Sequence, residues 1–225
     1  MSTTVPTTSK KGYRGLGMEG FIARWYARNT AKSLADYHKS AAEVAAQVPE
    51  GGSVLEVAPG PGYLAIELAR LGNYRVVGLD ISHSFVRMAA ENAARAGVTV
   101  AFEHGDAAAM PFAADTFDFI VCRAAFKNFA EPVRALGEMH RVLRPGGQAL
   151  IIDLRRDATP ADIKTAVKGM GLGWFSSLLT RWAFRFMLLK RAYTQEEMRE
   201  MASQTPFRSC EIRTDLIGMD VTLTK

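Results

Sequence analysis

Apolar residues along the chain alternate between short continuous runs and longer stretches at helical spacing. The segment 53–57 (SVLEV) is a short apolar run, typical of a strand that is covered on both faces. After it, apolar residues recur at helical spacing: Tyr63, Leu64, Ile66, Leu68, Ala69 and Leu71. Gly60 and Gly62 lie between the two patterns, where a turn can bring the backbone close to a ligand. We therefore expect a strand, a glycine turn and a helix that begins near Gly62.

The same change of pattern repeats along the chain and predicts an α/β protein. Further strands are expected over 74–79, 98–103, 117–122, 148–154, 209–215 and 217–224. Helices are expected over about 18–48 (as one helix or two), 83–96, 132–143, 160–189, and from 195 onward. Ser82 and Gly97 suit the two ends of the helix over 83–96. Thr194 and Glu197 have the spacing of a capping box.

The composition is ordinary for a globular protein, and the net charge gives only a weak indication of which molecules the protein binds. A length of 225 residues suits one α/β domain, and residues 1–12 are polar enough to form a disordered tail. The net charge of +5 permits an anionic partner. Nucleic acid is not expected, because the basic residues are spread along the chain.

The two cysteines are too few for a disulfide framework, and Cys122 is expected to be a buried free thiol. The first residues lack the apolar core of a signal peptide, and no apolar run is long enough to span a bilayer. A cytoplasmic protein without stable membrane insertion is therefore expected. No spacing of His, Cys, Asp or Glu indicates a metal site.

The glycine turn favours one nucleotide-binding motif over another. In a G-x-G-x-x-G fingerprint the glycines would be Ala58, Gly60 and Tyr63, and a tyrosine fits the third position poorly. An acid followed by small-x-Gly-x-Gly fits Glu56, Ala58, Gly60 and Gly62. That pattern resembles the first motif of class I S-adenosylmethionine (SAM) dependent methyltransferases. An ordinary strand-to-helix turn of another α/β protein is the alternative.

Two further acids fit the same resemblance. Asp80 ends the second strand and can accept hydrogen bonds from both hydroxyls of a ribose, although a helix N-cap is the alternative. The string GDAAAMPFAADTFDFIV resembles the third and fourth motifs of the methyltransferases. The resemblance implies that Asp106 accepts from the adenine amino group and that the Ala107 N–H meets a ring nitrogen. It places Ile81 and Phe112 beside the adenine ring.

The loop 123–128 (RAAFKN) follows the fourth strand, at the edge where open α/β sheets bind ligands. Arg123 and Phe126 are expected beside the cofactor. Many members of the family carry an aromatic residue and a histidine here, whereas this chain has Phe126 and Lys127, so no histidine base is expected. Lys127 and Arg155 are candidates to meet an anionic acceptor, with solvated surface cations as the alternative.

The string EMHRVLRPGGQALIID resembles the helix, turn and fifth strand of the same class. The resemblance implies a Rossmann-like sheet of seven strands, mostly parallel with an antiparallel last strand, and helices on both faces. Residues 13–225 would form one domain, with 13–48 as a helical lid through which Tyr13 and Tyr26 touch ligand; a packed core helix is the alternative. The basic helical insertion over 157–192 is a core helix, a lid or a membrane-surface segment.

These observations favour a small-molecule methyltransferase, of the kind called type 11, that uses SAM and releases S-adenosylhomocysteine. The acceptor is expected to be anionic or partly apolar, and positioning with in-line transfer can carry the reaction without a general base. No catalytic residue is therefore assigned. A non-catalytic SAM-binding or partner-activating subunit is the alternative, and a nucleotide-linked oxidoreductase is disfavoured by Tyr63 and Asp106. The acceptor atom and the oligomeric state are left open.

Overall fold

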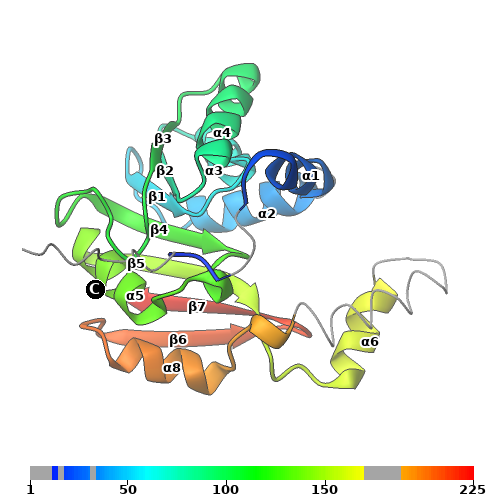
Figure 1. Ribbon diagram of the computed structural model, residues 1–225. Helices are drawn as coiled ribbons and strands as arrows, with labels where there is room; N and C mark the ends of the chain where they lie inside the picture. The colour runs from blue at the N-terminus through cyan, green and yellow to red at the C-terminus, as the bar shows by residue number, and fades with distance from the viewer. Residues whose placement is uncertain (1–11, 15–17, 31–33, 170–188) are drawn as a thin grey trace, which may run out of the picture.

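The computed structural model describes residues 12–14, 18–30, 34–169 and 189–225, and within them a seven-stranded sheet forms the centre (Figure 1). The strand order is β3-β2-β1-β4-β5-β7-β6. The strands are β1 (Ser53–Val57), β2 (Arg75–Asp80), β3 (Ala101–His104), β4 (Phe117–Arg123), β5 (Leu143–Leu154), β6 (Ser209–Thr214) and β7 (Gly218–Thr224). The first five pair in parallel, and β7 runs antiparallel to both β5 and β6. The expected mostly parallel sheet with an antiparallel last strand is confirmed.

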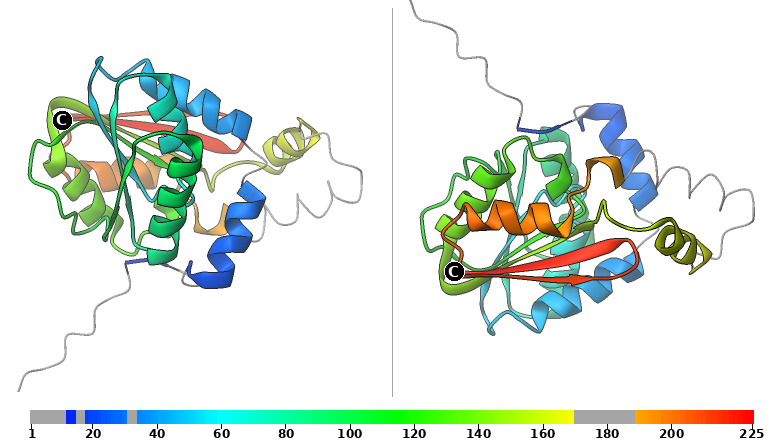
Figure 2. Two further views of the ribbon diagram at one scale, coloured as in Figure 1. Left: turned by 90° about the horizontal axis from the view of Figure 1, so that it is seen from above. Right: turned by 90° about the horizontal axis from the view of Figure 1, so that it is seen from below.

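Helices cover both faces of the sheet (Figures 1 and 2). The α-helices are α1 (Gly20–Thr30), α2 (Leu34–Ala45), α3 (Tyr63–Leu71), α4 (His83–Ala96), α5 (Pro132–Val142), α6 (Pro160–Gly169) and α8 (Gln195–Ser203). Two short 3-10 turns are η2 (Phe126–Asn128) and η4 (Leu189–Arg191). Helices α2 and α3 share one apolar cluster with the sheet, and α5 and α8 share another. Helix α4 packs beside α3, against β2 and β3.

The apolar run of β1 is continuous because the strand contributes to both clusters. Val54 points into the cluster of α2 and α3, whereas Leu55 and Val57 point into the cluster of α5 and α8. All five residues of β1 are buried. A central parallel strand is covered on both faces in this way, so its sequence does not alternate.

Most expected elements are confirmed, and the exceptions have local causes. The pattern over 18–48 forms two helices, α1 and α2. Strand β5 begins at Leu143 rather than at 148, because the expected RPGG turn forms part of the strand. At this point the pairing of β5 with β4 is irregular, and its register shifts between Phe117 and Phe119. Helix α6 ends at Gly169, and the expected helical residues 170–188 lie outside the described residues.

The expected caps are confirmed. The Ser82 Oγ accepts from the Phe85 N–H at 3.1 Å, and Gly97 ends α4 with a φ of 69°. Thr194 and Glu197 form the capping box of α8. Cys122 is a fully buried free thiol, as expected. Over the described residues, no helix has the length and apolar character needed to cross a bilayer.

Candidate functional site

The turn between β1 and α3 is built from residues with positive φ. Ala58, Gly60 and Gly62 have φ values of 59°, 55° and 81°. The Ala58 N–H donates to the Leu79 carbonyl at 2.8 Å, which fastens the turn to β2. A Cβ atom on Gly62 would lie 2.9 Å from the Cβ of Ala89 in α4. The turn therefore needs small residues.

Asp80 lies at the end of β2, beside this turn. Its carboxylate accepts from the Gly60 N–H at 3.0 Å and from the Ser82 N–H at 2.8 Å, and it is 5% exposed. Burial raises the pKa of Asp80 to about 6, against the lowering effect of these two N–H groups. The cap of α4 is Ser82, so Asp80 is not the N-cap. Each carboxylate oxygen keeps a free lone pair, as binding of two ribose hydroxyls requires.

A carboxyl group and a guanidinium group lie near the ends of the neighbouring strands β1 and β4. The Oε2 of Glu56 and the Nε of Arg123 are buried and have no hydrogen-bond partner within the described structure. Burial raises the pKa of Glu56 to about 8, although the Ala65 N–H and Arg123 oppose the shift. The Arg123 guanidinium stacks over the Tyr37 ring, 4.5 Å from its centroid. Such unpaired groups are costly, and an ammonium and a carboxylate on one ligand would satisfy both.

Two short stretches before α1, residues 12–14 and 18–19, lie at this end of the strands; together we call them the N-terminal strap (Figure 2). One end pairs with the loop after β4: the Arg14 N–H donates to the Asn128 carbonyl at 2.7 Å, and the Ala130 N–H donates to the Gly12 carbonyl at 3.2 Å. The other end meets the loop after β2, where the Ser82 Oγ donates to the Met18 carbonyl at 2.6 Å. The two attachments hold the strap on either side of β1.

The strap lies directly against the residues expected to bind adenine. A Cβ atom on Gly12 would be 2.6 Å from the Cγ of Asp106 and 2.7 Å from the Cδ1 of Ile81. One Asp106 oxygen accepts from the Ala108 N–H at 2.9 Å, and the carbonyl accepts from the Ala109 N–H, which closes the turn containing Ala107. The structure therefore brings Ile81, Asp106 and Ala107 together beneath Gly12.

Three further candidates, all aromatic, differ in their surroundings. Tyr13 is half-buried, and burial raises its pKa, with Arg191 lowering it and Asp80 raising it. Phe126 is 1% exposed and packs against the rings of Phe129 and Tyr193, inside the core. Tyr26 belongs to α1, but its side chain lies outside the described part of the structure.

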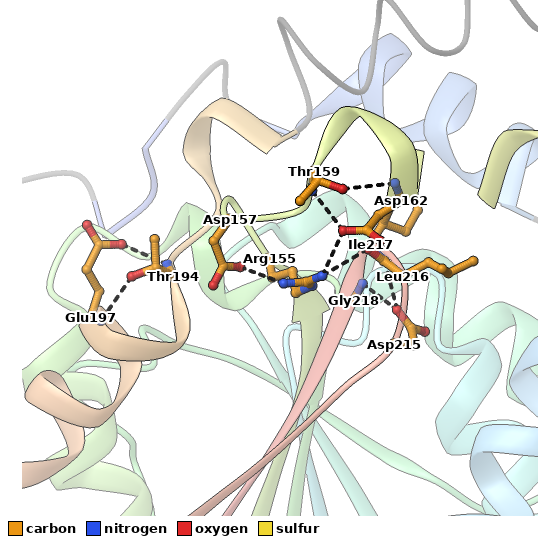
Figure 3. A network of polar contacts seen from close by, with 10 residues as sticks. All are labelled: Arg155, Asp157, Thr159, Asp162, Thr194, Glu197, Asp215, Leu216, Ile217 and Gly218. Atoms are coloured by element: carbon orange, nitrogen blue, oxygen red, sulfur yellow. Dashed lines mark hydrogen bonds and ion pairs between the residues drawn. The ribbon is translucent and has the colours of Figure 1, made fainter. Parts of the chain in front are cut away.

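Lys127 is not a solvated loop cation. Its Nζ lies 2.6 Å from the Oδ1 of Asp153 and donates to the Ala124 carbonyl at 2.7 Å, and the Lys127 side chain is 12% exposed. Arg155, by contrast, is held in a separate network (Figure 3). Its guanidinium pairs with Asp157 and Asp162, each at 3.2 Å, and fixes the connection after β5. The structure does not bring Arg155 together with Lys127.

The sequence did not indicate Tyr37, or a basic pocket formed where the strap meets the end of the sheet. The pocket has a volume of about 370 Å³ and is lined by Arg14, Lys127, Arg156, Lys190, Arg191 and Tyr193. The Lys190-Arg191 pair was the visible signal, but Arg14 comes from the other end of the chain and joins only through the fold. Among the residues described, no group of three or more His, Cys, Asp or Glu side chains could hold a metal ion.

Comparisons with known proteins agree with this geometry. Residues 54–147 match a family model described as "Methyltransferase domain". A demethylmenaquinone methyltransferase of Deinococcus radiodurans is 37% identical over 115 residues, which are 51% of this chain and 47% of that protein. The ubiquinone/menaquinone biosynthesis C-methyltransferase UbiE of Marinomonas is 34% identical over 48% of this chain and 45% of its own length.

A solved structure extends the likeness beyond the matched segment. The SAM-dependent methyltransferase of Aquifex aeolicus superposes with a TM-score of 0.65 at 19% identity, over 83% of this chain and 88% of that one. Residues 54–147 thus match the methyltransferase domain family, and the chain has the class I SAM-dependent methyltransferase fold. The chain spans about half the length of the curated relatives it matches.

Proposed function

We propose that this chain is an enzyme that transfers the methyl group of SAM to a small-molecule acceptor and releases S-adenosylhomocysteine. The observation that carries the proposal is that one atom of each side chain, the Oε2 of Glu56 and the Nε of Arg123, is buried without a hydrogen-bond partner among the described residues. The methionine part of SAM carries a carboxylate, which matches the positive charge of Arg123, and an ammonium, beside which Glu56 would give up its proton and become the matching anion. The family match over 54–147 includes both residues and supports the same reading.

The other candidate residues fit the remaining parts of the cofactor. Asp80 would accept from the ribose hydroxyls, Asp106 from the adenine amino group, and Ile81 would flank the ring. When bound, SAM supplies an electrophilic methyl on a sulfonium centre. The residues of this chain would orient it and exclude water, with the N-terminal strap closing the edge above Asp106. No residue is assigned as a base.

The relatives support one acceptor class, because their names include demethylmenaquinone and ubiquinone. A quinone-like acceptor with an apolar body is therefore one candidate for this chain. The family match ends at residue 147, before η4 and Tyr193, so it carries no information about the residues that would contact the acceptor there. The alternative of a SAM-binding subunit without turnover also stays open to test.

Calorimetric titration with SAM, S-adenosylhomocysteine and NADH tests the proposal. We expect the first two to bind and NADH not to bind. Replacing Glu56→Gln keeps the shape of a protonated Glu56 but removes the charge that meets an ammonium. Loss of a charge-assisted hydrogen bond costs about 1.5–3 kcal/mol, so the Kd for SAM should rise about 10- to 100-fold.

The matched control is Glu91→Gln, which removes a carboxylate from an exposed position on α4 and should leave the Kd for SAM unchanged. Tight binding of NADH, or equal SAM affinity in the Glu56→Gln variant, would contradict the proposal. Release of S-adenosylhomocysteine with a panel of quinols, phenols and carboxylic acids then separates an enzyme from a non-catalytic SAM-binding subunit.

A further inference from the structure

The basic pocket is assembled from four separate segments of the chain. The strap contributes Arg14, the loop after β4 contributes Lys127, and the connection after β5 contributes Arg156. The segment around η4 contributes Lys190, Arg191 and Tyr193. The Arg14 Nη1 donates to the Tyr193 hydroxyl at 3.1 Å, and the Arg191 Nη1 donates to the Arg14 carbonyl at 3.2 Å. These contacts hold the two guanidinium groups in place through neutral acceptors, which leave their charges uncompensated.

The five cations of the pocket fall into two groups, those with a carboxylate partner in the described part of the chain and those without one there. Lys127 pairs with Asp153, and Arg156 pairs with Glu197. Arg14, Lys190 and Arg191 take part in no ion pair among the described residues. Three like charges around one cavity repel one another, and a bound anion would relieve that repulsion.

The pocket lies at the edge of the sheet where the methyl group would be transferred. Lys127 follows β4, and the Arg156 N–H donates to the Tyr193 carbonyl just after β5, the neighbouring strand. Tyr13, next to Arg14, lies near enough to both Asp80 and Arg191 for their charges to act on its pKa, Arg191 lowering it and Asp80 raising it. In open α/β sheets ligands bind at this edge, so an acceptor could reach both sites at once.

We propose that the basic pocket of Arg14, Lys190, Arg191 and Tyr193 binds a carboxylate or phosphate group of the methyl acceptor. The inference rests on the proposed function, because only an acceptor needs to lie beside the cofactor. Guanidinium groups bind either oxyanion through paired N–H donors, and the Tyr193 hydroxyl adds a neutral donor. The volume of about 370 Å³ is within the usual range for small-molecule sites, about 300–1,000 Å³.

Calorimetry with three probes tests the pocket: inorganic diphosphate, phenyl phosphate and 4-hydroxybenzoate. The wild-type protein should bind phenyl phosphate or 4-hydroxybenzoate, and the double variant Lys190→Gln/Arg191→Gln should weaken that Kd at least tenfold. The matched control is Lys164→Gln/Lys168→Gln, which removes two charges from exposed positions on α6 and should bind the probes as the wild type does.

The affinity for SAM is measured on the same samples. The Lys190→Gln/Arg191→Gln variant should keep the wild-type Kd for SAM, which also shows that it is folded. Failure of SAM binding in every sample would remove the proposed function but leave the anion result readable. The inference is overturned if no probe binds, if both double variants bind equally, or if only inorganic diphosphate binds, which would indicate a site for a free anion.

Discussion

Glu56 makes the stability of the protein depend on pH in an unusual direction. Burial raises its pKa from the usual 4.5 to about 8, so between these values the folded protein holds a proton that the unfolded chain has lost. We therefore expect its contribution to the free energy of unfolding to fall as pH rises from about 5 to 8. Urea denaturation at pH 5, 6, 7 and 8 measures this, and Glu56→Gln should remove much of the decline.

Asp80 contributes in the same direction over a lower window, because its pKa is raised from 3.8 to about 6. The decline that remains above about pH 7, where Asp80 is ionised in both the folded and the unfolded protein, should therefore come mainly from Glu56 and be absent in Glu56→Gln. The Glu91→Gln protein should follow the wild-type curve. Parallel curves for wild type and Glu56→Gln over pH 6–8 would mean that Glu56 is ionised in the folded protein.

Ala58 carries a side chain at a backbone conformation that favours glycine. Its φ is 59°, and a Cβ in the left-handed region costs roughly 1–2 kcal/mol. Ala58→Gly relieves this strain, partly offset by the greater freedom of glycine when unfolded, so stability should stay within about 1 kcal/mol of wild type. Ala58→Val places a β-branched side chain there and should lower the free energy of unfolding by about 1–3 kcal/mol in urea titrations. Equal stability of the two variants would contradict the strained turn.

At the scale of elements, the N-terminal strap is the segment whose position matters most to the site. A Cβ on Gly12 would come within 2.6 Å of the Asp106 Cγ, so Gly12→Val must displace either the strap or Asp106. We expect the Kd for SAM to rise at least fivefold in calorimetry, with little loss of stability, since the strap is attached at the edge of the fold. Gly137→Ala is the control, because a Cβ there meets nothing within 4 Å. Unchanged SAM affinity in Gly12→Val would show that the strap does not contribute to the site.

The elements that could be predicted from the sequence are those whose signals are local. The apolar run of β1, the glycine turn, and the Ser82 and Thr194 caps depend on neighbouring residues, and each lies where it was expected. The predicted start of β5 was wrong, because the register shift between β5 and β4 depends on pairing between strands that are separate in the sequence. Arg14 was missed because its partners, Tyr193 and Arg191, are far away in sequence.

Individual candidates show the same limit. Lys127 has the composition of a loop cation, yet its partner Asp153 is 26 residues away on the next strand. Asp80 could be proposed from its position at the end of a predicted strand, and Asp106 from the resemblance of its motif to the methyltransferases. The hydrogen bonds that these carboxylates accept could not be predicted, because they depend on how the turns fold. One example is the bond from the Gly60 N–H to Asp80.

At the scale of the whole molecule, the parallel strands have two ends, and we expect one end to contribute mainly to stability and the other mainly to ligand binding. At the edge opposite the candidate site, the Asp118 carboxylate accepts from the Ser53 N–H and the Ser53 Oγ, both at 2.8 Å, and pairs with Arg144 at 2.6 Å. Burial opposes ionisation, but Ser53 and Arg144 outweigh it and hold the pKa of Asp118 below its usual value. These contacts join the starts of β1, β4 and β5.

Two isosteric substitutions test this division. Asp118→Asn weakens the pairing with Arg144 and should lower the free energy of unfolding by about 1–3 kcal/mol, while the Kd for SAM stays within about threefold of wild type. Asp106→Asn should raise the Kd for SAM and leave the free energy of unfolding close to that of the wild type. Its amide oxygen can still accept from the Ala108 N–H, but the amide nitrogen then replaces the oxygen that faces Gly12 and cannot accept from an adenine amine. Urea titration and calorimetry on both variants check the pair, and loss of SAM affinity in Asp118→Asn at unchanged stability would show that the two edges are coupled.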